Sequence, residues 1–500
     1  MANPRRDSRQ FIKNASRKAQ PVRTPRFKTM HLTWIGAIML PLGIYAYFFA
    51  PNLLYVATIF LLPFSATAIL NFGFINATTG IQAMIYFGTL WMLSVGPGAL
   101  TRCREWKSRP MQTSVRRLRF FMLVVGLSLL MPIWINGGLT VEPYEPGTVE
   151  AGPLRFTPRN ITQTMYLAFG VLLTLFLAVK NSNLRELKKT IRIFLISSFF
   201  ASCWGMLQWF CYWAGFNYPD FIFNTSRGES AMGYTQALED VGLTRVCSVA
   251  TEPSIFAQFS LIALVFAIFA VVSGRVVISK FWDRAVLFVT VVVLLMTTST
   301  TAYVGLAIVV PVSLLGLWFL RRLKPGFLAL VGLAILAVFV GYMHSSLAQV
   351  VADRMIASKV EAGSGLSRLT SVLLGFSYFL RYPVLGIGWG SATSLDLVMK
   401  LLSNTGILGL FAFGWFLKNL FAQLWRSMSR PTSRIGIPER TYWACCLLVA
   451  SFILITTSEL SGFAFVYGHT WFVFGIASAV PFLRESNPKT GIPTLASVTE

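Results

Sequence analysis

The chain has 500 residues, of which 55% are hydrophobic and only 12% are charged, and its mean hydropathy is +0.63. A soluble domain carries about 25% charged residues, so this composition excludes an ordinary soluble protein and indicates a membrane protein. The formal net charge of +24 would suggest nucleic acid in a soluble chain, but here the charges lie between apolar runs and no nucleic-acid partner is expected.

Apolar runs long enough to cross a bilayer recur along the chain. A helix needs roughly 20 apolar residues to span the ~30 Å hydrocarbon layer, and only a helix there satisfies its own backbone. We therefore predict an all-α polytopic membrane protein with 12–13 transmembrane helices. The runs lie near residues 32–50, 52–70, 80–98, 120–137, 163–180, 193–213, 254–273, 285–299, 302–320, 326–343, 404–422, 441–458 and 468–484.

Basic segments between the runs predict the orientation, because short loops rich in Lys and Arg stay in the cytoplasm. The tail of residues 1–31 is also basic, yet three runs separate it from the basic segment at 101–119, and an even number is needed. Either one of these runs dips in and returns, or two of them form one longer element. The basic segments are 101–119, 180–192, 274–284, 321–324 and 418–440.

Two outward segments are unusually long, and such loops in a compact membrane domain tend to be functional. In the second of them, arginines punctuate apolar turns, which predicts helices lying at the membrane interface. The expected parts are a cytoplasmic tail (1–31), an N-terminal transmembrane bundle (32–213), a first long periplasmic loop (214–253), central transmembrane helices (254–343), a second long periplasmic loop (344–403), C-terminal transmembrane helices (404–484) and a cytoplasmic tail (485–500).

Charged residues are nearly absent from the predicted spans, which argues against an ion-coupled carrier. The first long loop ends in LTRVCSVATEPSIFAQF, where Glu252 and Pro253 open a helix. Glu252 could accept a proton from a hydroxyl as a general base; the alternative is a helix-capping Glu paired with Arg245. His469 and Glu459 bracket the last outward loop at the same level, and a structural histidine is the alternative to a catalytic one.

Outward-facing arginines are the second set of candidates. Arg354, Arg368 and Arg381 share a predicted compartment with Arg245, and guanidinium groups bind phosphates in a bidentate manner. Arginines that reach from apolar helices to the interface are the alternative. The stretch PVLGIGWG offers backbone amides, but a tight connection is the simpler interpretation. The three histidines lie far apart, and neither a metal nor a cofactor is expected.

The order of these motifs resembles the O-antigen ligase and Wzy-type polysaccharide polymerase superfamily. TEPSIFAQF is followed by TTSTTAYVGL, then by GLSR, YPVLGIGWG and LLSNTGILGL. The resemblance covers roughly residues 240–425. The matching positions are Glu252, Pro253, Ser254, Arg368, Pro383, Gly386, Gly388, Gly390, Gly406 and Gly409.

The resemblance implies a GT-C-like enzyme of the bacterial inner membrane with its site at the periplasmic face, independent of metal and of nucleotide sugars. Such enzymes take a glycan from undecaprenyl diphosphate and join it to a sugar hydroxyl. For this chain, the expected catalytic residues are Glu252, Arg368 and His469. The expected diphosphate-binding residues are Arg245, Arg354, Arg368 and Arg381.

A polymerase transfers the glycan to the next lipid-linked repeat unit, whereas a ligase transfers it to lipid A core. Many ligases carry a His-Asn pair where this chain has Leu395 and Asp396, so a polymerase of O-antigen or exopolysaccharide is the leading hypothesis. The ligase is the alternative, and a lipid-linked oligosaccharide flippase is less favoured because internal repeats are not evident. Expected partners are undecaprenyl diphosphate-linked oligosaccharides, membrane lipids and a chain-length regulator.

Overall fold

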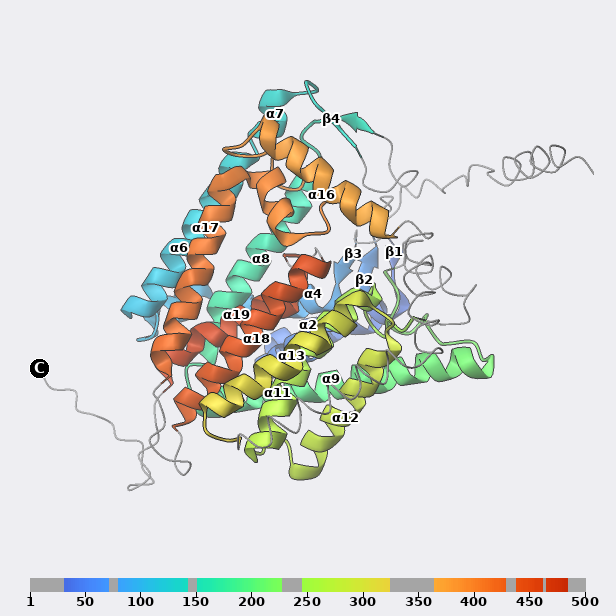
Figure 1. Cartoon of the computed structure of the whole chain (residues 1–500), viewed down its shortest axis with the longest axis vertical. Coiled ribbons are helices and arrows are strands. Elements are labelled where there is room, and N and C mark those ends of the chain that lie inside the picture. The colour runs from blue at the N-terminus through green and yellow to red at the C-terminus, as the bar shows by residue number, and fades with distance from the viewer. Residues whose placement is uncertain are drawn as a thin grey trace, which may run out of the picture.

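The computed structural model describes residues 31–71, 80–142, 151–226, 245–323, 364–428, 438–461 and 465–483. Helices dominate these ranges, and seven of them are long and apolar enough to cross a membrane. The predicted all-α polytopic membrane fold is therefore confirmed (Figure 1). The seven are Arg109–Ile135 (α6 and α7), Pro158–Lys180 (α8), Leu184–Ala214 (α9), Pro253–Ser273 (α11), Thr300–Phe319 (α13), Leu397–Ser427 (α17) and Glu439–Leu460 (α18, which ends at Ser461).

Shorter elements complete the described chain. The predicted run 326–343 lies outside the described residues. The shorter helices are α2 (Trp34–Phe49), α3 (Pro51–Phe60), α4 (Ala83–Val95), α5 (Pro97–Arg102), α12 (Lys280–Met296), α16 (Ser364–Arg381) and α19 (Gly468–Ala479), which the 3-10 turn Val480–Phe482 extends. The strands are β1 (His31–Leu32), β2 (Ala68–Asn71), β3 (Gly80–Gln82), β4 (Thr140–Val141) and β5 (Gly152–Pro153).

Helix α11 is the centre of the bundle. Its sequence is apolar on all sides, and nearly all of its residues are buried. A helix with no polar face is stable only when protein or lipid surrounds it. Here the neighbours are α9, α12, α13 and α18. The first turn of α11 therefore lies among the ends of these four helices. Glu252 is the N-cap residue of this turn.

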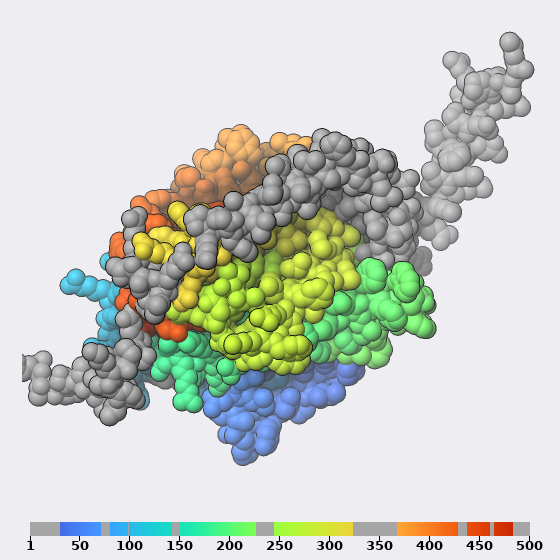
Figure 2. All heavy atoms as spheres, turned by 60° about the horizontal axis from the view of Figure 1, so that its bottom comes forward, coloured from blue at the N-terminus to red at the C-terminus, as the bar shows by residue number. Residues whose placement is uncertain are grey.

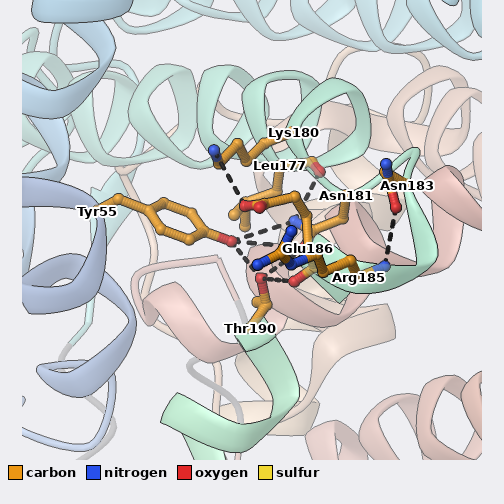
Figure 3. A network of polar contacts seen from close by, with 8 residues as sticks. All are labelled: Tyr55, Leu177, Lys180, Asn181, Asn183, Arg185, Glu186 and Thr190. Carbon is orange, nitrogen blue, oxygen red and sulfur yellow. Dashed lines mark hydrogen bonds and ion pairs between the residues drawn. The ribbon is translucent and has the colours of Figure 1, made fainter. Parts of the chain in front are cut away.

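The first two apolar runs form a hairpin, α2 and α3, that turns at Ala50. Near this turn, the hydroxyl of Tyr55 contacts Thr190 and lies 3.4 Å from Oδ1 of Asn181, in the connection between α8 and α9 (Figure 3). At the opposite end, Ala66 N donates to the carbonyl of Val249 at 3.2 Å. The hairpin therefore reaches from the level of the predicted first periplasmic loop to a predicted cytoplasmic loop.

This hairpin leaves the number of runs before residue 101 odd, and neither of the two expected solutions is observed. β1 pairs with β2 in antiparallel register, with His31 opposite Asn71, so the start of α2 lies at the same end as Val249. α2, α3 and α4 then place residues 31 and 101 at opposite ends of the bundle. The side occupied by residues 1–30, which lie outside the described residues, stays a prediction. In the space-filling view the residues of α2 and α3, in blue, lie along one edge of the molecule, next to green residues of α9 (Figure 2).

Ion pairs bring three of the predicted cytoplasmic segments together at one end, called the inner end below. Glu439, at the start of α18, accepts Lys188 and Arg275 at 3.0 Å each. Lys188 belongs to the start of α9, and Arg275 follows α11. A third pair joins Lys180 and Glu186 at 3.0 Å. The opposite end, called the outer end, carries the starts of α11 and α17 and the end of α18.

Candidate active site

The Gly-rich segment 383–390 packs against a break in α17 at the outer end. The backbone at Gly406 leaves helical geometry, with φ 64° and ψ −165°, which frees carbonyls before it and amides after it. Ile387 N donates to the carbonyl of Ser403 at 2.8 Å, and Ile407 N donates to the carbonyl of Pro383 at 2.9 Å. The segment thus supplies the hydrogen bonds that the broken helix lacks, as required for irregular backbone at membrane depth.

Glycine is required at two positions of this contact. A Cβ at Gly406 would stand 2.3 Å from the carbonyl oxygen of Val384, and one at Gly388 would stand 2.4 Å from Cδ of Pro132. Both residues also have positive φ, which other L-residues avoid. The amides of Ile387 and Gly388 donate to carbonyls of α17. These glycines therefore make a tight connection, the simpler of the two interpretations, and these two amides do not face a ligand.

Arg368 lies on α16, which crosses the ends of α17 and α18 at the outer end (Figure 1). Its Nη1 donates to the carbonyl of Leu460, in the last turn of α18. Ser371, one turn later, accepts from Leu395 N at 3.3 Å. The guanidinium is half-buried and is thereby fixed where α16, α17 and α18 meet.

Two carboxyl groups face each other where α17 begins and α18 ends. Asp396 is the N-cap residue of α17 and accepts from Met399 N at 2.6 Å. Glu459, from the last turn of α18, lies within hydrogen-bonding reach of Asp396 and accepts from Val398 N at 3.5 Å. A helix amino terminus favours negative charge, but two adjacent carboxylates repel, so such a pair tends to share a proton. Both carboxyl groups lie at the outer end, where Glu459 directly precedes Leu460, whose carbonyl accepts from Arg368.

Glu252 is the N-cap residue of α11 and is half-buried. Ser254 Oγ donates to its Oε2 at 3.1 Å, whereas its carboxylate makes no capping bond to the helix amides. The carboxylate therefore lies at the outer end of the most buried of the seven candidate membrane spans. Helix capping, the alternative use of this residue, is not observed.

His469 lies deeper, in the first turn of α19, and is 1% exposed. Its Nε2 is 3.0 Å from Oε1 of Gln258, and Gln258 Nε2 donates to Ser458 Oγ at 2.9 Å. Its ring stacks on Tyr467, with centroids 5.8 Å apart. His469 thus links α11, α18 and α19 beneath the outer surface, and Gln258 is six residues into α11 from Glu252.

Arg245 precedes the turn that leads into α11. Burial raises the pKa of the neighbouring Cys247 thiol, and the positive charge of Arg245 acts in the opposite direction. The guanidinium also lies close enough to Tyr303, in the first turn of α13, to interact with it electrostatically. Arg245 and Glu252 therefore belong to the same face of the bundle, at the starts of α13 and α11.

The structure does not bring Arg381 to Arg368. They lie thirteen residues apart on the same helix, which corresponds to roughly 20 Å at 1.5 Å per residue. Arg381 Nη2 donates instead to the carbonyl of Gly138 at 3.3 Å. Arg354 lies outside the described residues. One diphosphate could not contact both Arg368 and Arg381, so the expected arginine cluster is divided.

Sequence reasoning missed two features of the outer end. Asp396 and Glu459 are 63 positions apart, and no pattern signals that they meet. Lys400, in the first turns of α17, is only 8% exposed, and the charge of Arg159 lies nearby. Within the described ranges, no group of three or more His, Cys, Asp or Glu residues is placed to hold a metal ion.

A family model described as O-antigen ligase matches residues 285–397. Over this segment the chain resembles the O-antigen ligase and Wzy-type polymerase superfamily. The resemblance predicted from the motif order is therefore confirmed. The matched segment includes Arg368, Arg381 and Asp396, whereas Glu252 and His469 lie outside it. No curated protein matches the chain significantly.

Proposed function

We propose that this chain, which resembles the O-antigen ligase and Wzy-type polymerase superfamily, is a polymerase of a bacterial surface polysaccharide. The polysaccharide would be of the O-antigen or exopolysaccharide type. It would be a GT-C-like glycosyltransferase of the inner membrane, with its site at the periplasmic face. Its donor would be a glycan on undecaprenyl diphosphate, and its acceptor a hydroxyl of the next lipid-linked repeat unit. The family match supports the reaction class, and the arrangement around Arg368 supports the location.

The single observation that carries the proposal is the fixed position of Arg368 beside ionisable groups at the outer end. The bond between the sugar and the diphosphate breaks, and undecaprenyl diphosphate leaves with the electron pair. Arg368 and Arg245 would stabilise the negative charge that develops on this leaving group. The acceptor oxygen forms the new glycosidic bond and loses its proton to a base. No metal or cofactor is needed to balance this step.

We assign the base to Glu252 rather than to His469. Glu252 is half-buried at the outer end, where an acceptor hydroxyl can approach it. His469 is buried and its Nε2 is engaged with Gln258, so we propose that it positions α11 beneath Glu252. The pair Asp396 and Glu459 lies beside Arg368 and is a second possible proton acceptor.

The test is a comparison of surface glycans made by Arg368→Ala and Glu252→Gln at unchanged protein level. Both should collapse the polymer to single repeat units, because loss of one electrostatic contact to developing charge costs roughly 10²–10³ in rate. Arg104→Ala is the matched control, since Arg104 is an exposed arginine of the segment 101–119 at the inner end of the bundle. Normal chain lengths in both variants would overturn the assignment.

A ligase is the second candidate, because the matching family model is described as O-antigen ligase. A deletion strain separates the two. Loss of a polymerase leaves single repeat units on lipid A core, whereas loss of a ligase leaves long chains on the undecaprenyl carrier. The position of Asp396 in place of a His-Asn pair supports the polymerase. A polymerase would also be expected to work with a chain-length regulator.

A further inference from the structure

A cavity of about 440 Å³ opens at the outer end of α16, away from Arg368. Its volume lies within the roughly 300–1,000 Å³ typical of small-molecule sites. One wall is the carboxyl end of α16, and the other is the segment that leads into β4. The lining residues are Gly137, Gly138, Leu139, Thr140, Glu142, Leu374, Ser377, Tyr378 and Arg381.

The floor of this cavity is a small apolar core of its own. Leu139 and Tyr378 pack there with Ile387 and Ala392, which belong to the Gly-rich segment and the loop after it. The wall formed by the segment that leads into β4 is fixed by Leu154 N, which donates to the carbonyl of Leu139 at 2.7 Å. The cavity is therefore built on the same rigid contact that seats the Gly-rich segment against α17.

The polar groups around the cavity have a mixed character. Arg381 and Glu142 carry opposite charges, and within the described ranges no ion pair joins them. Tyr378 OH accepts from Glu142 N at 2.9 Å, and burial raises the pKa of this phenol, which keeps its proton available for donation. Ser377 Oγ donates to the carbonyl of Leu374, which leaves its oxygen able to accept.

This combination disfavours the simplest ligands. Glu142 would repel a diphosphate, Arg381 would repel a cation, and both would be left without partners by an apolar molecule. A sugar ring presents neighbouring hydroxyl groups that donate to a carboxylate and accept from a guanidinium at the same time. We propose that the cavity is a saccharide subsite that holds a glycan residue of the growing donor chain.

The subsite rests on the proposed polymerase function, and its location gives it a distinct role. Its lining on α16 begins at Leu374, roughly 9 Å along the helix from Arg368, and ends at Arg381, roughly 20 Å away, so it holds a part of the glycan that is remote from the new bond. Contacts to such remote parts bind substrate without acting on the reacting atoms. Damage to the cavity should therefore weaken glycan binding and shorten the product, while the first linkage is still made.

The direct test uses the full-length protein in nanodiscs and, as probe, the host's own repeat-unit oligosaccharide released from its carrier by mild acid. Glu142→Gln and Arg381→Gln should each weaken binding roughly tenfold, because each removes a charge-assisted hydrogen bond. Ser377→Trp should fill the cavity and abolish binding without removing a charge. Arg104→Gln, at an exposed arginine of the inner end, is the matched control and should bind like the parent. Saturation-transfer NMR measures the interaction.

Equal binding by Glu142→Gln, Arg381→Gln and Ser377→Trp would overturn the subsite. Binding of inorganic diphosphate that Ser377→Trp abolishes and Arg368→Ala leaves intact would also overturn it, because the cavity would then hold a diphosphate. In cells, Glu142→Gln and Ser377→Trp should give shorter chains that still contain several repeat units. The proposed function itself would fail if Arg368→Ala made polymer of normal length. That outcome does not depend on the chain lengths that the cavity variants give.

Discussion

The two ends of the bundle hold their charges in different ways. At the inner end, acidic and basic side chains neutralise each other, as in the pairs of Glu439 with Lys188 and Arg275. At the outer end, Arg368 and Arg381 donate to the backbone carbonyls of Leu460 and Gly138. A carbonyl fixes a guanidinium without cancelling its charge. The described ion pairs therefore lie at the inner end, whereas Arg381 at the outer end keeps oriented charge that a polar substrate can use.

The largest expected effect follows from breaking the outer scaffold at Gly388. An alanine there would place Cβ 2.4 Å from Pro132 Cδ at a φ of 102°, and strain and overpacking together cost roughly 2–6 kcal/mol. Gly388→Ala should lower the melting temperature strongly and abolish polymer. Gly414→Ala is the control, because nothing lies within 4 Å of its Cβ position in α17. Unchanged melting of Gly388→Ala would contradict the tight packing of the Gly-rich segment.

A smaller effect is expected from the buried network at the inner end. Tyr55 is 1% exposed, and its hydroxyl contacts Thr190 and Asn181 (Figure 3). Tyr55→Phe should lower the free energy of unfolding by about 1–2 kcal/mol, because the buried side chains of Thr190 and Asn181 would lose a hydrogen-bond partner. Polymer length should not change, since the network is remote from Arg368. Tyr45→Phe, on the exposed face of α2, is the control for thermal unfolding. A change in chain length by Tyr55→Phe would contradict the division between the two ends.

The sequence predicted the membrane fold and the family resemblance because both depend on local patterns. Apolar runs report spans directly, and the glycines of PVLGIGWG report a backbone that must approach Pro132 and α17 closely. The arginines of the second loop were expected to gather in one place. Interfacial helices were predicted for this region, but not that residues 364–381 form one helix, which separates Arg368 from Arg381.

The rest of the outer site depends on tertiary packing. Glu459 meets Asp396 only because the end of α18 lies against the start of α17, and periodicity within either helix carries no information on that contact. The hairpin of α2 and α3 is similar. The apolar runs alone left open whether one of them dips in and returns. The contact of Tyr55 with the α8–α9 connection shows that α2 and α3 turn at the inner end.

The same substitution at the two ends of α18 gives the sharpest comparison, although each effect is only about 1 kcal/mol. Glu439→Gln removes two partly exposed ion pairs, with 32% of the Glu439 side chain exposed, so it should destabilise the protein modestly. Glu459→Gln removes the repulsion with Asp396 and supplies an amide that can donate to that carboxylate, so it should stabilise the protein by a similar amount. Thermal unfolding at alkaline pH, where the parent's carboxyl pair has lost its shared proton and repels, measures both, and the double variant should melt close to the parent because the two sites are independent. A destabilised Glu459→Gln would mean that its carboxylate is held as an ion by Arg368, and the outer end would then resemble the inner end after all.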